Sequence, residues 1–185
     1  MGGAWTEAPG SAVLDTLYET LPGLQLVAED LGDLRPEVLT LRDHYHLPGM
    51  KVLEFTVDLA GKRARDTSPD KTRQIVYTGT HDNATVVEWY ESLTTPQRRK
   101  LRRYLKERGA VGGQVYQRMV RLALKSKAEL AVIQAQDVLG LGKEARMNLP
   151  GTVGAPNWQW RLKDFEALKK AMKPLARAIQ ETKRA

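Results

Sequence analysis

The 185-residue sequence contains no cysteine, three histidines and two phenylalanines. Without cysteine the chain can form neither a disulfide nor a Cys-ligated zinc site, and it has no thiol nucleophile. The histidines, His44, His46 and His81, show no His-x-x-x-His spacing, so no metal site is predicted. A chain without cysteine suits a reducing compartment such as the cytoplasm.

Long apolar runs and nucleotide-binding motifs are also missing. No segment approaches the roughly 18 apolar residues of a membrane span, so no membrane partner is expected. Residues 1–7 have neither the basic nor the apolar region of a secretory signal. Gly140 and Gly142 lack the rest of a dinucleotide fingerprint, and no Ser-centred nucleophile elbow occurs. We therefore expect no cofactor.

The charge is distributed unevenly along the chain. Residues 1–90 contain 8 Lys and Arg and 14 Asp and Glu, a net charge of −6, whereas residues 91–185 have a net charge of +13. The cluster Arg98 to Lys106 is compatible with a nucleic-acid interface. The aromatic side chains that single-strand binders place among their basic residues are missing, however. This absence favours solvated basic helices over nucleic-acid binding.

Hydrophobic residues (42%) and charged residues (28%) are in ordinary globular proportion. Apolar runs alternate with helical patterns, and a polar excursion covers residues 58–73. Asp33 is the expected cap of the first predicted helix. The predicted strands are 24–28, 50–56, 74–78 and 130–134, and the predicted helices are 36–45, 85–92, 97–108, 115–126 and 162–182.

This alternation predicts an α/β fold with a parallel sheet and crossover helices. Function in such sheets gathers where strands end at their carboxyl side. Glu29 and Asp30 follow the first predicted strand. At the mouth of a buried strand Glu29 would be partly desolvated, which suits a general acid. Helix capping or a salt bridge is the alternative role for Glu29.

A second polar group follows the third predicted strand. Thr80, His81, Asp82 and Asn83 resemble a loop that grips a ligand, although Asp82 could instead form an Asx turn. Paired carboxylates are what glycoside chemistry requires. Trp158 and Trp160 are candidates for stacking on sugars, or alternatively for anchoring the last helix.

Several motifs resemble one enzyme family. In their order and spacing they are similar to the C-terminal catalytic half of amylomaltase, the 4-alpha-glucanotransferase (disproportionating enzyme) family, glycoside hydrolase family 77. The resemblance runs from near residue 1 to about residue 170. It is carried by the segments 28–32, 47–53, 77–83 and 139–148, and it extends through 150–161.

The resemblance implies a cofactor-free, cytoplasmic (β/α)₈ barrel enzyme. Such an enzyme moves α-1,4-glucan segments between acceptors through a covalent glucosyl-enzyme, so maltooligosaccharides are the expected partners. Carried over by motif, Glu29 is the general acid/base and Asp82 is the transition-state stabiliser. The expected substrate contacts are His81, Asn83, Asn148, Asp30 and Trp158.

One part of the family's machinery has no counterpart in this sequence. The family's nucleophile is an Asp within an Arg-x-Asp-His motif, whereas the only Asp-His pair here, Asp43-His44, lies in a predicted helix. A (β/α)₈ barrel needs roughly 250 residues. We therefore expect residues 1–185 to be the C-terminal half of a barrel, with about four parallel strands, as a fragment or split half.

Such a half-barrel is expected to be inactive alone. It would need the missing N-terminal half, or it would self-associate through open sheet edges at 24–28 and 130–134. The alternative functions are a non-catalytic α-glucan-binding module and a basic nucleic-acid-binding domain.

Two residues depart from the family pattern. Glu88 stands before Trp89 where a small residue is usual, and Gln134 stands where proline is common. We expect both to alter local packing or acceptor contacts without touching the catalytic carboxylates.

Overall fold

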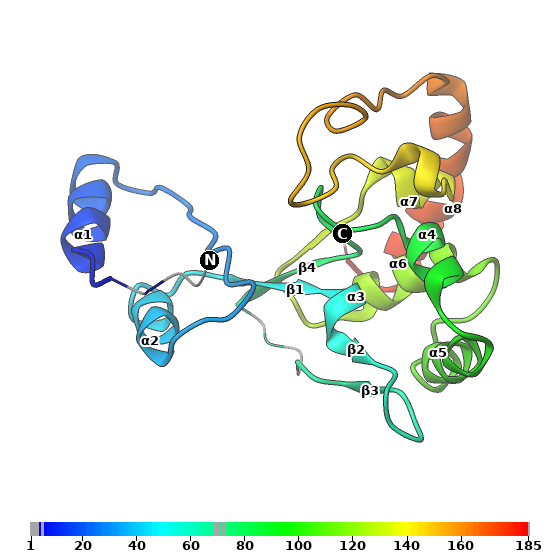
Figure 1. Cartoon of the computed structure of the whole chain (residues 1–185), viewed down its shortest axis with the longest axis horizontal. Coiled ribbons are helices and arrows are strands. Elements are labelled where there is room, and N and C mark those ends of the chain that lie inside the picture. Colours follow the sequence, from blue (N-terminus) through cyan, green and yellow to red (C-terminus); the bar gives the residue numbers. More distant parts are fainter. Residues whose placement is uncertain (1–3, 5, 69–70, 72, 185) are drawn as a thin grey trace. The chain divides into compact units, whose positions relative to one another are not determined.

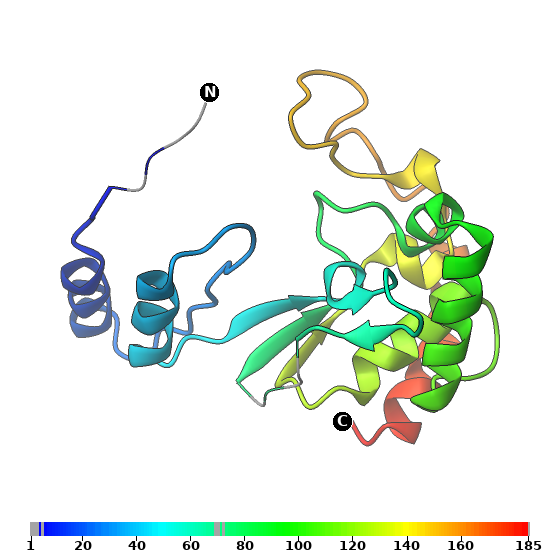
Figure 2. The same cartoon turned by 60° about the horizontal axis from the view of Figure 1, so that its bottom comes forward.

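The computed structural model describes residues 4, 6–68, 71 and 73–184. Parts of residues 1–7 and of the predicted excursion 58–73 therefore lie outside the described residues. The chain divides into two compact units, Met1–Met50 and Lys51–Ala185, and each is described by itself (Figures 1 and 2). Within the described residues, none of the helices combines the length and the apolar character that crossing a membrane requires.

The first unit contains two helices, α1 (Gly10–Thr20) and α2 (Pro36–His44). The sequence predicted helix α2 but not helix α1. Tyr45 joins them, because its hydroxyl donates to Asp15 Oδ1 at 2.6 Å and its ring stacks with Tyr18. The prediction that Asp33 caps helix α2 is wrong. Arg35 is the N-cap, because proline is favoured in the first helical turn and Pro36 starts the helix.

The predicted strand 24–28 is not formed. Leu24, Leu26 and Ala28 are half-buried while the residues between them are exposed, so the alternation of a strand is present. The Ala28 N–H donates to the Pro48 carbonyl at 3.0 Å. No described strand pairs with the segment, and backbone groups make a strand only when a neighbouring strand bonds them.

The central sheet has three described strands in the order β1 (Gly49–Val52), β4 (Gln74–Tyr77) and β5 (Leu130–Val132). β4 and β5 are parallel, with Ile75 opposite Leu130 and Tyr77 opposite Val132. This confirms the predicted α/β class with a parallel sheet. The strand predicted at 50–56 is too long, because the chain turns into a short helix, α3 (Leu53–Thr56), directly after Val52.

The excursion after α3 contains a small antiparallel pair, β2 (Val57–Asp58) with β3 (Arg65–Asp66). Lys100 on α5 (Thr95–Glu107) stabilises the loop between these two strands, because its ammonium donates to the carbonyls of Leu59 at 2.9 Å and Gly61 at 2.5 Å.

The remaining helices confirm most of the predicted pattern. Thr94 caps α5 through a capping box with Gln97. The five-residue α7 was not predicted, and α8 continues through Pro174. The helices are α4 (Val86–Ser92), α5 (Thr95–Glu107), α6 (Val115–Lys125), α7 (Ala135–Leu139), the 3₁₀ turn η1 (Lys143–Ala145) and α8 (Phe165–Glu181).

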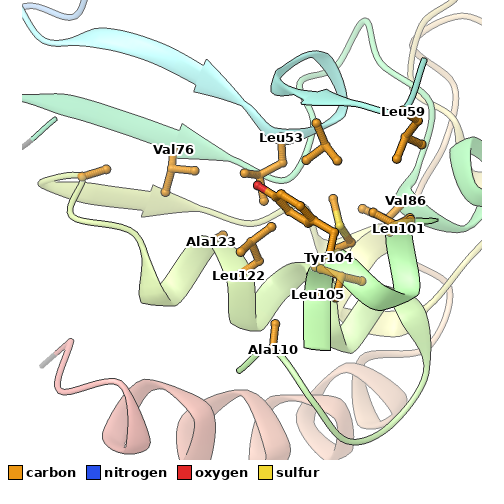
Figure 3. Close-up of a cluster of buried hydrophobic side chains, with 13 residues drawn as sticks. Leu53, Leu59, Val76, Val86, Leu101, Tyr104, Leu105, Ala110, Leu122 and Ala123 are labelled. Atoms are coloured by element: carbon orange, nitrogen blue, oxygen red, sulfur yellow. The ribbon is translucent and has the colours of Figure 1, made fainter. Parts of the chain in front are cut away.

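The core of the second unit lies between the sheet and helices α4, α5 and α6 (Figure 3). Val76 from β4 meets Leu101 and Leu105 from α5 and Met119 from α6, all of them fully buried. A smaller cluster joins α6 to α8 through Val120, Leu124 and Ala178. This core fixes where β4 and β5 end, and hence where the loops after them begin.

Leu105→Ala is expected to lower the free energy of unfolding by about 2–5 kcal/mol, because truncating a fully buried leucine leaves a cavity. Leu149→Ala, at a position that is 48% exposed, is the matched control and should change it little. Urea denaturation followed by circular dichroism measures both. Equal losses in the two variants would contradict this placement of the core.

Candidate active site

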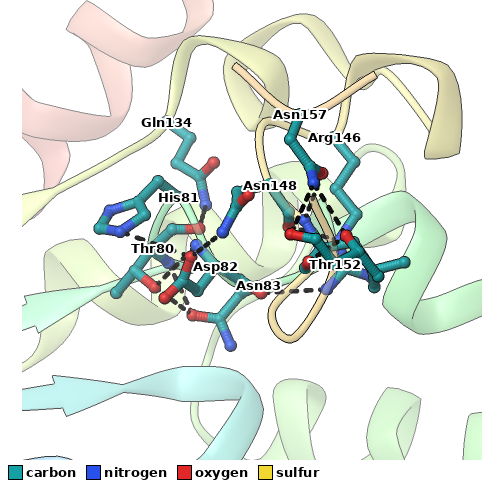
Figure 4. Close-up of polar contacts among 10 residues, drawn as sticks. Thr80, His81, Asp82, Asn83, Gln134, Arg146, Asn148, Thr152 and Asn157 are labelled. Carbon is teal, nitrogen blue, oxygen red and sulfur yellow. Dashed lines mark hydrogen bonds and ion pairs between the residues drawn. The ribbon is translucent and has the colours of Figure 1, made fainter. Parts of the chain in front are cut away.

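The loop after β4 is closed by its own polar groups. The backbone N–H and the hydroxyl of Thr80 donate to Asn83 Oδ1 at 2.8 and 2.7 Å, and the Asn83 N–H returns to the Thr80 carbonyl at 3.1 Å. Asn83, predicted to contact sugar, is 8% exposed, and its oxygen closes this turn. The turn leaves the side chains of His81 and Asp82 half exposed, at 51% and 48% (Figure 4).

Gly79, directly before this loop, lies close to the side chains of Gln134 and Asn83 and to the Ala84 carbonyl. A Cβ on Gly79 would lie 2.7 Å from Gln134 Nε2. The same Gln134 amide donates to the Thr80 carbonyl at 3.1 Å. Gln134 thus supports the loop through its side-chain amide.

Four of the predicted site residues lie together at the end of β4. The Asn148 amide donates to Asp82 Oδ1 at 2.6 Å, and the Asn148 backbone N–H donates to the His81 carbonyl at 3.1 Å. His81 Nε2 lies 3.5 Å from Asp82 Oδ1, and its ring centroid is 5.0 Å from that of Trp158. Trp158 is 56% exposed. The group presents a carboxylate, an amide, an imidazole and an indole to one surface.

An open groove runs beside this group along the segment 143–163. Its volume is about 1200 Å³. Arg146, Asn148 and Trp160 contribute to its wall, together with Glu88 and Lys163. A groove of this size has room for several sugar rings.

Arg146 is a site residue that the sequence analysis missed. Its guanidinium uses all three nitrogens: Nε donates to the Asn148 carbonyl at 2.9 Å, Nη2 to the Asp82 carbonyl at 3.0 Å, and Nη1 pairs with Glu88 Oε1 at 3.4 Å. These partners lie up to 64 residues away in sequence, so no local pattern reveals them.

A buried cluster of carboxyl groups underlies the loop. Asp137 accepts from the Thr78 hydroxyl at 2.6 Å and from the Val86 N–H at 2.8 Å. Desolvation by burial raises the pKa of Asp137, while these two hydrogen bonds act to lower it. The sequence analysis did not single out Asp137 or Glu54.

Glu54, on α3, is the most strongly perturbed group of this cluster. Desolvation raises its pKa to about 9, and the charges of Asp137 and Glu88 add to the rise while that of Arg146 opposes it. Among the described residues, Glu54 Oε1 and Glu88 Oε2 are buried without a hydrogen-bond partner. Glu54 is therefore protonated in the folded chain at neutral pH.

The other two predicted residues, Glu29 and Asp30, belong to the first unit. Glu29 is exposed in this chain, so the expected desolvation at the mouth of a buried strand is not observed. Asp30 is half-buried, forms an ion pair with Arg42 and accepts from the Met50 N–H at 2.6 Å. A Cβ on Gly49 would lie 2.3 Å from the Asp30 carboxylate, which explains the glycine there.

Within the described residues, no group of three or more His, Asp or Glu side chains is placed to hold a metal ion. The polar side chains gathered at the site carry carboxyl, amide, imidazole and guanidinium groups.

The site thus has an exposed carboxylate held by an amide, beside an imidazole and an indole. It lies at the carboxyl end of a parallel strand, where α/β sheets bind their ligands. The sequence profile of the 4-alpha-glucanotransferases matches residues 1–168, and the chain belongs to this family. The family resemblance read from the motifs is thereby confirmed.

Individual relatives agree with this assignment. The chain is 42% identical over 165 residues to a 4-alpha-glucanotransferase of Thermus thermophilus, covering 86% of this chain and 33% of that protein. A 4-alpha-glucanotransferase of Synechocystis is 43% identical over 162 residues, covering 86% and 31%. The chain thus spans about a third of the length of the curated relatives it matches.

Solved structures show the same fold. The amylomaltase of Streptococcus agalactiae in complex with acarbose superposes with a TM-score of 0.79 at 28% identity, covering 95% of this chain and 36% of that one. The amylomaltase of Corynebacterium glutamicum gives a TM-score of 0.62 at 18% identity, covering 85% and 29%.

The buried carboxyl of Glu54 predicts that stability falls with rising pH. The folded chain keeps a proton up to about pH 9, whereas the unfolded chain releases it near pH 4.5, so this contribution is complete below pH 4.5 and is lost progressively up to pH 9. Glu54→Gln should therefore melt a few degrees above the unaltered chain at pH 8, since ~1 kcal/mol shifts Tm by about 2–4 °C at this size.

Thermal unfolding at several values between pH 5 and pH 9 measures the difference, which should shrink toward pH 5. Glu129→Gln, at an exposed position, serves as the control. The quantity compared is the Tm of Glu54→Gln minus the Tm of the unaltered chain. If this difference is smaller at pH 8 than at pH 5, Glu54 is not protonated in the folded chain.

Proposed function

We propose that this chain forms the C-terminal part of a (β/α)₈ barrel 4-alpha-glucanotransferase, which transfers α-1,4-glucan segments by a retaining mechanism. The observation that carries the proposal is the group of Asp82, Asn148, His81 and Trp158 at the end of β4, in a chain of this family. The substrate would be a maltooligosaccharide or a longer α-1,4-glucan.

Asp82 is the proposed transition-state stabiliser. Asn148 orients its carboxylate by donating to Oδ1 at 2.6 Å, and nearly half of the side chain faces solvent, where a sugar hydroxyl can reach it. The adjacent imidazole and exposed indole suit hydrogen bonding and stacking on a sugar ring. The amylomaltase of Streptococcus agalactiae, a structural neighbour, is in complex with acarbose.

Glu29 is the proposed general acid/base. Retaining chemistry needs a second carboxylate about 5–5.5 Å from the acid/base to act as nucleophile. The family's nucleophile motif does not occur in the sequence. The remainder of a barrel would therefore supply that carboxylate and would also desolvate Glu29, which is exposed here.

The edges of the central sheet, as formed by the described residues, fit such a remainder. β1 and β5 are the edges of the described central sheet, and Leu130 and Val132 on β5 are exposed. Half-buried and exposed residues alternate in segment 24–28 as they do in a strand, but no described strand is hydrogen-bonded to it. We propose that further strands pair with these segments in the whole enzyme. Self-association through the same edges, and a cytoplasmic location, stay predictions.

The basic helix α5 does not favour the nucleic-acid alternative. Arg98 donates to the carbonyls of Leu93 and Glu91, and Lys100 donates to the β2–β3 excursion. Cations bound to backbone carbonyls of their own chain stabilise the fold. A non-catalytic α-glucan-binding module remains the second candidate, because the nucleophile motif is absent from this sequence.

The isolated chain is expected to show no disproportionation of maltotriose, since the nucleophile is missing. A chimaera in which this chain replaces the matched third of the Thermus thermophilus enzyme should release glucose from maltotriose. Glucose assays on the isolated chain and the chimaera measure both. An inactive but folded chimaera that binds maltooligosaccharides in calorimetry would favour the binding module instead.

Glu29→Gln in the chimaera is expected to cut disproportionation by about 10²–10⁴-fold, the usual contribution of a general acid–base group. Glucan binding should persist, because the amide keeps the shape of the side chain. The exposed Glu19 gives the matched control variant, Glu19→Gln. Near-normal turnover of Glu29→Gln would show that another group transfers the proton.

Asp82→Asn in the chimaera is expected to lower kcat with little change in KM, because a stabiliser acts chiefly in the transition state. Initial rates over a range of maltotriose concentrations separate the two constants. A raised KM at unchanged kcat would assign Asp82 to ordinary substrate binding.

A further inference from the structure

Asp82 is held at two separate points by the side chains of Asn148 and Arg146, and the Arg146 side chain also bonds the main chain of Asn148 (Figure 4). Asn148 donates its side-chain amide to the Asp82 carboxylate, and Arg146 donates to the Asp82 main-chain carbonyl. Arg146 in addition donates to the main-chain carbonyl of Asn148 at 2.9 Å. The three residues form a closed network in which the guanidinium fixes both the donor and the acceptor of the Asn148–Asp82 hydrogen bond.

The guanidinium is itself fixed by a carboxylate on a different element. Glu88 lies in the first turn of α4, where its N–H is bonded to the Thr85 hydroxyl at 3.2 Å. Its Oε1 pairs with Arg146 Nη1, and the two side chains are 17% and 23% exposed. Such partly buried pairing holds the arginine more firmly than an exposed ion pair does. Helix α4 thereby sets the position of Arg146 relative to the loop.

We propose that Arg146, anchored by Glu88, is a positioning residue that sets the orientation of the Asp82 carboxylate through the main-chain carbonyls of Asp82 and Asn148. This inference rests on the proposed function for its kinetic consequence, but not for its geometry. Lysine cannot replace this arrangement, because a single ammonium does not reproduce the planar set of three nitrogens that reach three partners.

The geometric part is tested in the isolated chain by NMR. In Arg146→Met the carbonyl ¹³C resonances of Asp82 and Asn148 and the side-chain amide resonances of Asn148 are expected to move. In Arg103→Met, a control on the exposed face of α5, they should stay in place. Unmoved resonances in a folded Arg146→Met chain would overturn the proposal. If Arg146→Met does not fold, Arg146→Lys and Glu88→Gln answer the same question by the same resonances.

The kinetic part is tested in the chimaera. Arg146→Met is expected to lower kcat by roughly 10²-fold, the loss that a misplacement of about 1 Å causes, with KM little changed. Arg146→Lys should recover only part of this loss. Glu88→Gln should lose less, because its amide oxygen still accepts a hydrogen bond, although a neutral one. Added guanidinium at concentrations far below denaturing should raise the kcat of Arg146→Ala and leave that of Asp82→Asn unchanged.

Each result has a distinct meaning. A raised KM at unchanged kcat would make Arg146 a substrate contact of the groove and would overturn the positioning role. Unchanged kcat in Arg146→Met would overturn it as well. An unaltered chimaera without activity would instead contradict the proposed function, and the NMR comparison in the isolated chain would then decide the inference about Arg146.

Discussion

The buried carboxylate of Asp137 holds both ends of the loop on which the site depends. One oxygen accepts from Thr78 at the end of β4, and the other accepts from the N–H of Val86 at the start of α4. His81 and Asp82 lie between these two points. Burying a carboxylate costs free energy unless it is hydrogen-bonded. The two bonds therefore stabilise the buried Asp137 side chain and hold the loop at the same time.

This arrangement concentrates acidic groups beneath the site. Desolvation raises the pKa of Glu54, and the nearby charges of Asp137 and Glu88 add to the rise, while that of Arg146 acts in the opposite direction. The positive charge of Arg146 therefore has two effects. It moderates the repulsion among the carboxyl groups below, and its hydrogen bonds hold the main chain of the surface loop above.

The two units carry different parts of the proposed site. The second unit carries a formed group around Asp82 on a packed core. The first unit carries the exposed Glu29 next to Asp30, which forms an ion pair with Arg42. The chain spans about a third of the length of its relatives. The core under β4 is formed within the chain, whereas none of the described strands pairs with segment 24–28.

The sequence by itself determined the family, most of the helices, the strands at β4 and β5, and the residues around Asp82. It could do so because these depend on local propensity, hydrophobic period and motifs of a few adjacent residues. The tertiary structure alone decided that 24–28 is not a strand, that Asn83 and Asp30 bond within the chain, and that Arg146, Glu88, Glu54 and Asp137 lie together. The grouping of Arg146, Glu88 and Asp137 with the site loop depends on contacts between segments some 50 to 65 residues apart, which no local pattern encodes. Asp30 bonds to residues 12 and 20 positions away. Asn83 bonds to the nearby Thr80, and only the folded loop decided that its side chain faces inward rather than toward a ligand.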